Sequence, residues 1–292
     1  MTVQRPTAAD LTVVIPTLGR DIIRESLESL AAGTYWPARI VVVDQGQRHE
    51  IAAAAAEITA RGLDTMWIPS TRTGRAAGVN DGVAAATSRF VAVTDDDCLV
   101  HPNWVAAMAA HLRRSPEAIV SGQVHGDGAV AASVAIDPGP RLQRRPAVRF
   151  DRLSGGNMGV AKALIVRLGG LDEDQCVRTA EDGEFAYRAL RNGVPILYAP
   201  EIAVTHVGWR SEPQRAAQYE SYGLSQGGFF GKYLRRGDIF IALRAGVHLL
   251  RALRRWAAGV VRHDPDGARN GRAYVSGLLP GIRAGWRSGS SR

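Results

Sequence analysis

Residues 90–98 read FVAVTDDDC, four apolar residues followed by a threonine and three consecutive aspartates. A short apolar run that stops at polar residues predicts a buried strand. Three earlier runs have the same character: LTVVIP (11–16), RIVVVD (39–44) and DTMWIP (64–69). Alanine-containing segments of helical length separate these runs, at 21–31, 50–61 and 76–87. This alternation predicts an α/β fold, with a mainly parallel central sheet and helices on both faces.

The second half of the sequence is less regular. Residues 122–146 are rich in Gly, Ala, Pro and Arg and predict an irregular excursion. After it we expect a strand that runs into a glycine turn, one helix, two short strands and two long helices, at 149–159, 179–192, 195–198, 202–206, 213–234 and 238–262. We therefore divide the chain into a first domain, 1–210, and a helical C-terminal appendage, 211–292.

Length, charge and cysteine content restrict the class of protein. The 292 residues, 46% of them hydrophobic, are enough for one large core and an appendage. The N-terminus shows no signal-peptide pattern, and no apolar run approaches the length of a spanning helix. The two cysteines form no CxxC pair. We expect a cytoplasmic protein that does not cross the bilayer.

The net charge of +8 is unevenly distributed along the chain. Residues 232–292 contain 13 Lys and Arg against 3 acidic residues, a balance of +10, which leaves −2 for the rest. An enzyme acting on nucleic acid more often concentrates basic residues around its catalytic cleft. We therefore predict no nucleic-acid partner, and a basic tail that faces a membrane or a protein.

The aspartate triplet that follows the strand at 90–94 is the sharpest chemical signal. Side chains two apart on an extended backbone point the same way, so Asp95 and Asp97 can face one site while Asp96 points elsewhere. Carboxylate ligands with open positions suit Mg²⁺ or Mn²⁺, which can in turn hold a diphosphate. The alternative is an acidic turn or N-cap before the next helix.

Two other strand ends carry candidate binding residues. Asp44 ends the run RIVVVD at the same predicted sheet edge, where it could bond a base or ribose; alternatively it forms the turn of the sequence DQG. Gly156 and Asn157 follow another predicted strand, where glycine permits a close approach and the amide can bond two ways. The alternative there is a tight turn.

Glu181, Asp182 and His206 are candidates in the second half. The two carboxylates open a predicted helix, where they could cap it or accept a proton from a sugar hydroxyl. His206 ends the apolar strand EIAVTH, and a lone histidine is usually structural. Imidazole joined to two carboxylates would instead form a site suited to Mn²⁺.

Together these segments resemble the family-2 inverting glycosyltransferases, which have the GT-A fold. The resemblance covers roughly residues 11–209 and rests on motifs in a fixed order: VVIPTLGR, VVVDQG, GRAAGVNDG, TDDDC, SGGNMGVAKALIVRLGGLDE and AEDGEFAYRALRNGVPILYAPEIAVTH. It implies a nucleotide-binding half at about 11–100 and an acceptor-side half at about 101–210. One departure from the family pattern is Val79, which precedes Asn80. Many relatives carry a basic residue at this position, and Arg75 could supply that charge instead.

The resemblance also implies roles for individual residues. Asp182 would be the general base, and Asp95, Asp97 and His206 would hold Mn²⁺ or Mg²⁺. The nucleotide-diphosphate sugar donor would contact Pro16, Thr17, Arg20, Asp44, Arg75, Asn80, Asp95 and Asp96. The acceptor or donor sugar would contact Gly156, Asn157, Glu181 and Trp209. The implied reaction inverts the anomeric carbon and belongs to cell-envelope, polysaccharide or glycolipid assembly.

Two other functions use similar features. A sugar-phosphate nucleotidyltransferase also combines an α/β sheet, a nucleotide and a divalent metal, but it would typically open with a glycine-rich basic loop, whereas VVIPTLGR has one glycine and one arginine. The third candidate is a non-catalytic module that binds a sugar nucleotide or a membrane. The acidic residue Asp182 argues against that module.

The predicted helix 238–262 has two different faces. One carries Arg244, His248, Arg251, Arg255 and Arg262, and another carries Ile239, Leu243, Leu250, Leu253 and Val260. Such a helix can lie in the interface of an anionic membrane, with its apolar side buried and its arginines at the phosphates, which would suit a lipid-linked acceptor. The alternative is a helix docked on the first domain with a solvated basic face.

Overall fold

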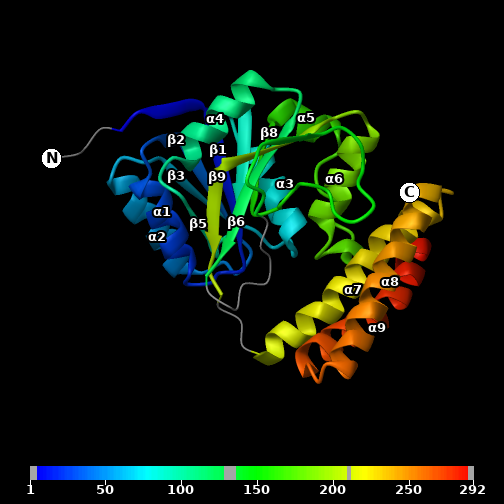
Figure 1. Ribbon diagram of the computed structural model, residues 1–292. Coiled ribbons are helices and arrows are strands. Elements are labelled where there is room, and N and C mark those ends of the chain that lie inside the picture. Colours follow the sequence, from blue (N-terminus) through cyan, green and yellow to red (C-terminus); the bar gives the residue numbers. More distant parts are fainter. Residues whose placement is uncertain (1–4, 128–135, 209–211, 289–292) are drawn as a thin grey trace. The chain divides into compact units, whose positions relative to one another are not determined.

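The computed structural model describes residues 5–127, 136–208 and 212–288, and the chain forms two compact units. Figure 1 labels the elements of both. The first unit comprises Met1–Arg145, Arg152–Leu171 and Ala186–Trp209. The second comprises Pro146–Asp151, Asp172–Phe185 and Arg210–Arg292. A single cut at residue 210 is thus too simple, because two short segments from the first predicted domain group with the C-terminal helices.

The N-terminal half of the first unit follows the predicted alternation. Its strands are β1 (Thr7–Thr17), β2 (Trp36–Asp44), β3 (Thr65–Pro69) and β4 (Phe90–Thr94), which lie parallel in the order β3-β2-β1-β4. The helices between them are α1 (Ile23–Ala32), α2 (His49–Ala60) and α3 (Arg75–Ala85). Parallel order places the carboxyl ends of these strands at one edge of the sheet, as predicted.

The rest of the sheet mixes parallel and antiparallel pairs. It contains β5 (Cys98–Val100), β6 (Ile119–Gly126), β7 (Arg141–Gln143), β8 (Asn157–Ala161) and β9 (Ile196–His206). Strand β8 is antiparallel to both β4 and β6, whereas β6 and β9 are parallel. Helices α4 (Trp104–Arg114) and α5 (Lys162–Arg167) also belong to this half, and α6 (Glu181–Arg191) is divided between the two units after Phe185. The sheet is therefore mainly parallel only in its first half.

Strand β9 replaces the two short strands predicted at 195–198 and 202–206. The β6–β9 register shifts between Gly122 and Gln123, so the continuous strand absorbs the irregularity around Pro200. A side chain at Gly122 would overlap the carbonyl oxygen of Ile202, so glycine permits this close pairing. Within 122–146, β6 and β7 correct the expectation of an irregular excursion.

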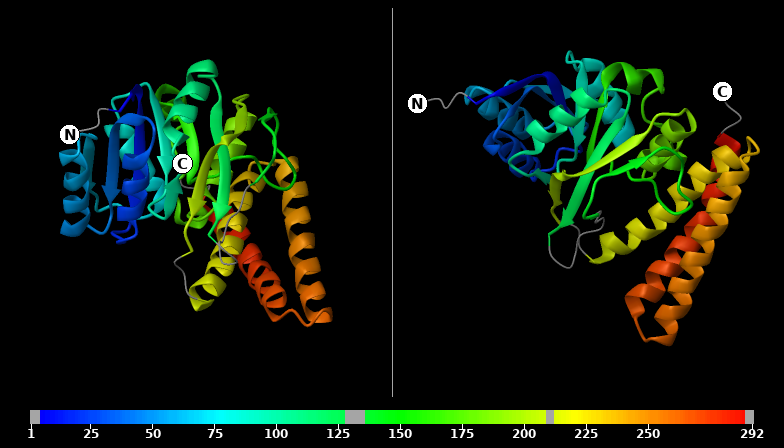
Figure 2. Two further views of the ribbon diagram at one scale, coloured as in Figure 1. Left: turned by 60° about the vertical axis from the view of Figure 1, so that its left-hand side comes forward. Right: turned by 45° about the horizontal axis from the view of Figure 1, so that its top comes forward.

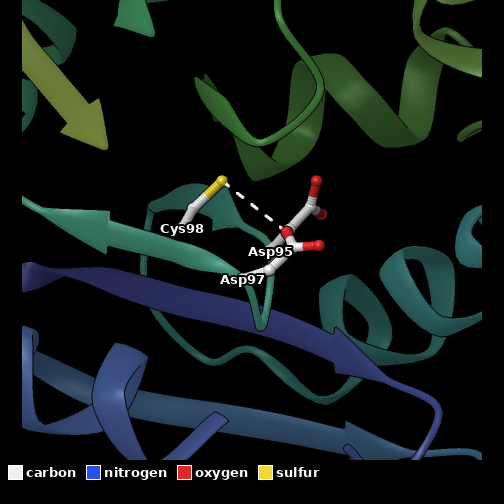
Figure 3. Close-up of side chains that lie close together, drawn as sticks. All are labelled: Asp95, Asp97 and Cys98. Atoms are coloured by element: carbon white, nitrogen blue, oxygen red, sulfur yellow. Dashed lines mark hydrogen bonds between the residues drawn. The ribbon is translucent and has the colours of Figure 1, made fainter. Parts of the chain in front are cut away.

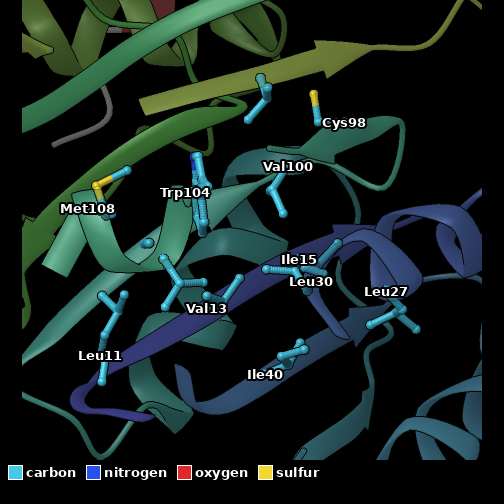
Figure 4. Packing of buried hydrophobic residues seen from close by; sticks show 14 of the residues in the cluster. Leu11, Val13, Ile15, Leu27, Leu30, Ile40, Cys98, Val100, Trp104 and Met108 are labelled. Atoms are coloured by element: carbon cyan, nitrogen blue, oxygen red, sulfur yellow. The ribbon is translucent and has the colours of Figure 1, made fainter. Parts of the chain in front are cut away.

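Helices cover both faces of the sheet. Residues of α1, α2 and α4, including Leu27, Ile51 and Trp104, pack with Val13 and Ile40 in one buried cluster (Figure 4). Val14 points to the opposite face, where a side chain at Gly82 of α3 would overlap it. Alternate residues of the apolar strands are thus buried on different faces, as expected for a covered parallel sheet.

The second unit contains three long helices and a 3₁₀ turn (Figure 2). These are η2 (Gln175–Val177), α7 (Glu212–Leu234), α8 (Ile239–Val261) and α9 (Pro265–Ser288). Glycines on α7 and α9 allow close backbone contact: a side chain at Gly227 would overlap the Leu278 carbonyl, and one at Gly281 the Leu224 carbonyl. Sequence analysis assigned no bounds to α9, which contains Pro280 and several glycines.

The inward face of α8 corrects the predicted basic surface. Arg244 and His248 are only 2% and 4% exposed. The Arg244 Nη1 donates to Asp151 Oδ2 at 2.7 Å, and His248 Nε2 donates to the Arg149 carbonyl at 2.7 Å. Because each has a polar partner inside this unit, neither belongs to a solvated or lipid-facing basic face. No described helix is long and apolar enough to cross a bilayer.

Candidate active site

The candidate site lies where β1, β2 and β4 end. Thr17 and Asp44 are aligned in the β1–β2 register, and the aspartate triplet forms the turn between β4 and β5. Figure 3 shows Asp95, Asp97 and Cys98 close together at this turn. The convergence of strand ends predicted from the sequence is confirmed.

Asp96 is fully buried and holds the turn against β1. Its carboxylate accepts a 2.6 Å hydrogen bond from Thr17 Oγ1 and bonds from Arg20, whose Nε lies 2.9 Å away. Burial raises the pKa of Asp96 to about 6, while Arg20 and Thr17 oppose that rise. The side chain thus has partners within the protein, and contact of Asp96 with the donor stays a prediction.

Asp97 lies beside His206, as the metal-site prediction requires. The His206 Nε2 is 3.5 Å from Asp97 Oδ1, and Arg20 Nη1 is 3.5 Å from Asp97 Oδ2. The antiparallel register of β5 and β9 pairs Cys98 with His206 and so sets this contact. Among the described residues, the buried Nδ1 of His206 has no hydrogen-bond partner. This histidine is therefore not held by an ordinary structural network.

Asp95 pairs with a basic residue, and two glycines lie against this pair. The Nε of Arg75, the first residue of α3, donates to Asp95 Oδ1 at 2.7 Å. A methyl group on Gly155 would come within 2.9 Å of the Arg75 guanidinium, and one on Gly156 within 2.8 Å of Asp95 Oδ2. The absence of side chains at these glycines lets the GGN segment pack directly against Arg75 and the acidic turn. Arg75 supplies positive charge here, whereas Val79 cannot.

The donor atoms fit a hard divalent cation. Ligand atoms of Asp95, Asp97 and Cys98 all lie within 4.8 Å of one another. Burial and the two neighbouring carboxylates raise the pKa of the Cys98 thiol, which therefore stays protonated and packs in the core. The remaining set is two carboxylates and the adjacent His206 imidazole, which suits Mn²⁺ or Mg²⁺.

Asp44 has partners inside the protein. Its oxygens accept hydrogen bonds from Gly46 N at 2.9 Å, Arg48 N at 2.8 Å and Trp67 Nε1 at 3.1 Å. The side chain is fully buried. These bonds confirm the turn-forming alternative, and contact with a nucleobase stays a prediction.

Asn157 and Asn80 both form hydrogen bonds within the protein. The buried Asn157 amide accepts from Trp104 Nε1 at 2.8 Å and donates to the carbonyls of Gln123 and Ile202 at 2.8 and 3.0 Å. It thereby joins α4, β6 and β9, and contact of Asn157 with the acceptor or donor sugar stays a prediction. Asn80 bonds both the N–H and the carbonyl of Leu171 at 2.9 Å.

The other predicted residues lie in several places. Pro16 is buried at the end of β1, where a side chain at Gly78 would come within 2.9 Å of its Cβ. Glu181 is buried and Asp182 half-buried in the first turn of α6, and Asp182 Oδ1 accepts from Gly183 N at 2.7 Å. Both belong to the second unit. Trp209 lies outside the described residues.

Sequence analysis assigned no role to Gly170, which positions Asn80. Gly170 has a φ of +70°, and a side chain there would come within 2.6 Å of Asn80 Oδ1. The available signal was the pair of glycines that ends α5 in the sequence LGGLDE, because glycine commonly terminates helices with positive φ. Gly170 and Asn80 are far apart in the sequence, so the sequence did not show that they contact each other.

Comparisons with solved structures identify the fold. The chain is similar to the Pyrobaculum calidifontis mannosyltransferase PcManGT, whose structure contains GDP-Man and Mn²⁺: the TM-score is 0.64 at 18% identity, covering 99% of this chain and 88% of that one. It is also similar to residues 1–349 of Staphylococcus aureus TarS with UDP-GlcNAc, with a TM-score of 0.58, 15% identity and 92% of both chains covered. The expected GT-A fold is confirmed.

Comparisons of sequence identify the family. A Mycobacterium tuberculosis pre-mycofactocin glycosyltransferase is 26% identical over 211 residues, which are 69% of this chain and 43% of the relative. Escherichia coli chondroitin synthase is 26% identical over 228 residues, 63% of this chain and 32% of the relative. The chain thus spans less than half the length of these curated relatives. The model described as glycosyl transferase family 2 matches residues 12–160, about half of the sequence, and the chain belongs to that family.

Proposed function

We propose that the chain is an inverting glycosyltransferase that moves a sugar from a nucleotide-diphosphate donor to an acceptor hydroxyl with the help of a divalent metal. The observation that carries this proposal is the closeness of the Asp95 and Asp97 carboxylates where β4 ends, with His206 of β9 beside Asp97. Membership of family 2 supports the reaction class. The structural relatives crystallised with GDP-Man or UDP-GlcNAc support the donor class.

In this proposal, the acidic turn holds the donor diphosphate through Mn²⁺ or Mg²⁺. Asp95, Asp97 and His206 would hold the ion, which when bound neutralises charge on the departing diphosphate. Arg75 orients Asp95, and Arg20 links Asp97 to the buried anchor Asp96. These pairings fix the carboxylates before the donor arrives, so less ordering is needed on binding.

Asp182 is the proposed general base. A sugar hydroxyl is a weak nucleophile, and a carboxylate within hydrogen-bond reach can take its proton during attack. Direct attack on the anomeric carbon, opposite the leaving diphosphate, forms one glycosidic bond as the donor bond breaks and inverts the configuration. The first-turn position of Asp182 in α6 is compatible with helix capping as well, so activity measurements must separate the two roles.

The proposed setting is assembly of a cell-envelope polysaccharide or glycolipid on the cytoplasmic side of a membrane. Support comes from the basic C-terminal region, whose residues 232–292 carry a balance of +10. A positively charged region attracts anionic lipid headgroups. A lipid-linked acceptor would be held at such a surface.

The test begins with donor binding. Purified protein is screened with UDP-, GDP- and dTDP-sugars for thermal stabilisation, with Mn²⁺ and then with excess EDTA, because a ligand that binds the folded state raises apparent stability. We expect at least one sugar nucleotide to stabilise the protein only with metal. NMR of the product anomeric proton then tests inversion.

Two outcomes would contradict the proposal. Formation of a sugar nucleotide from a nucleoside triphosphate and a sugar phosphate, with release of pyrophosphate, would indicate a nucleotidyltransferase. Metal-dependent binding without transfer to any hydroxyl acceptor, water included, would indicate a non-catalytic module.

A further inference from the structure

Helix α8 buries Arg244 and His248 and exposes several large apolar residues. Ile239 is 84% exposed, Leu243 56%, Leu250 57% and Val261 76%. With about 100° per residue, these side chains and Leu253 and Val260 fall on one face of the helix. The residues buried within this unit lie on the opposite face: Ile241, Arg244, His248, Ala252 and Gly259. We call the exposed set, Ile239, Leu243, Leu250, Leu253, Val260 and Val261, the apolar stripe.

The buried polar residues set the rotation of α8. Arg244 pairs with the buried Asp151, and His248 is bonded to the Arg149 carbonyl and, at 3.0 Å, to the hydroxyl of Tyr274. Turning the helix to bury the apolar stripe would expose these partners or leave Asp151 buried without its cation, which is costly. The outward position of the apolar stripe therefore follows from the packing of this unit.

Exposed arginines lie to one side of the apolar stripe. Arg254 lies about 60° around the helix from the centre of the stripe, and Arg251, Arg255 and Arg262 lie further round, at about 120° to 160°. Within the described residues, none of these four is paired with a carboxylate, although Arg251 and Arg255 lie over Phe150 and Tyr219. Helix α8 itself contains no Asp or Glu. The surface thus combines exposed apolar side chains with unneutralised positive charge.

We propose that the apolar stripe and its bordering arginines dock the chain on an anionic phospholipid bilayer. Apolar side chains would enter the headgroup–acyl boundary while the arginines meet lipid phosphates. A second copy of the chain is a poorer occupant, because its α8 offers no carboxylate to these arginines. This inference specifies the membrane contact within the proposed function, so its test measures lipid binding without donor or acceptor.

The experiment is flotation of the full chain with vesicles of phosphatidylcholine alone or mixed with phosphatidylglycerol. The wild type is expected to bind the mixed vesicles more tightly and to lose affinity in high salt. Replacing two residues of the apolar stripe, Leu243→Gln with Leu250→Gln, is expected to weaken binding more than about tenfold. The matched control replaces two exposed apolar residues of the first unit, Leu142→Gln with Val166→Gln, and should bind as the wild type.

A second variant pair tests the charge. Arg254→Gln with Arg262→Gln removes arginines that lie over no aromatic ring of the described residues, and should weaken binding to mixed vesicles about thirtyfold. The Lys versions at both positions should restore binding. Unchanged thermal unfolding shows that each variant is folded. The Asp182→Asn chain, which we expect to lose transfer activity, should bind vesicles normally, which separates this proposal from the transferase proposal.

Three results would overturn the inference. One is equal binding of the wild type to neutral and anionic vesicles. Another is full vesicle binding by the variant with both leucines replaced. The third is a concentration-dependent dimer that this variant abolishes, since the apolar stripe would then bind a second copy.

Discussion

Arg20 connects two aspartates that have different environments. It pairs with the buried Asp96 and reaches Asp97, which faces His206. Thr17 adds a hydrogen bond to Asp96. The acidic turn therefore contains one carboxylate, that of Asp96, which is bonded within the protein, and two others, those of Asp95 and Asp97, which we propose bind the metal ion. Substitutions at these neighbouring positions should have different consequences.

Asp97→Ala removes a proposed metal ligand. We expect metal-dependent donor binding to weaken by more than about tenfold, because one carboxylate of the ion site is lost. Isothermal titration with the donor found in the nucleotide screen, with and without Mn²⁺, measures the effect. Asp64→Ala is the control, since Asp64 pairs with Arg39 at the surface away from the acidic turn. Unchanged metal-dependent affinity in the Asp97 variant would remove this residue from the site.

Asp182→Asn tests the general base. The amide keeps the shape of the side chain and can still accept from Gly183 N through its oxygen, but it is too weak a base to take the hydroxyl proton. We expect turnover to fall by about 10²–10⁴-fold with donor affinity retained. Single-turnover transfer and donor titration measure the two effects. Turnover close to that of the wild type would show that Asp182 only caps α6.

At the scale of elements, α7 and α9 depend on glycine at their contact. A side chain at Gly281 would overlap the Leu224 carbonyl, and one at Gly277 would come within 2.6 Å of the Glu220 carbonyl. These obstacles are backbone atoms, which cannot move without shifting a helix. The four-residue spacing of Gly277, Gly281 and Gly285 therefore reflects close packing against α7, although glycine is a poor helix former.

Gly281→Ala and Gly246→Ala form a matched pair within this unit. The first inserts a methyl group against α7 and should lower the free energy of unfolding by about 1–3 kcal/mol. The second adds a methyl group that meets nothing within 4 Å on exposed α8, and should raise it by about 0.5–1 kcal/mol through helix propensity. Urea unfolding followed by circular dichroism measures both. Equal effects of the two substitutions would contradict the close α7–α9 packing.

At the scale of the whole molecule, burial of His248 makes stability depend on pH. Burial lowers the pKa of His248 to about 4, with Arg244 and Arg251 adding repulsion and the Arg149 carbonyl opposing the shift. Between the ordinary value of about 6.5 and 4, the unfolded chain binds a proton that the folded chain excludes. The stabilising contribution is complete above about pH 6.5 and is lost as the pH falls through 4.

His248→Gln should therefore flatten the decline of stability in acid. We expect the difference in unfolding free energy between wild type and variant to change by about 3 kcal/mol from pH 7 to below pH 4. Urea unfolding across that range measures it. The raised pKa of Asp96 has the opposite effect on stability in acid. The effect of His248 must therefore be taken from the difference between the wild type and the variant, and not from the wild-type curve alone. A pH-independent difference would contradict the assignment.

The sequence by itself determined the parallel half of the sheet and the meeting of strand ends at the acidic turn. Apolar runs that alternate with helical segments bury residues on both faces, which leaves few arrangements other than a covered parallel sheet. The closeness of Asp97 and His206 was expected from the family resemblance, whereas the antiparallel pairing of β5 and β9 that produces it was not. These features depend on patterns that are local or repeated along the chain.

Only the tertiary structure decided which polar groups are used internally and which face of α8 turns outward. Asn157 finds its partners on α4, β6 and β9, and Arg244 finds its partner, Asp151, 93 residues away. Helical periodicity groups residues on faces, but the buried face is chosen by the free energy of pairing with groups from distant segments. For that reason, the residues that predict an amphipathic helix could not show that Arg244 and His248 are buried while Leu243 and Leu250 are exposed.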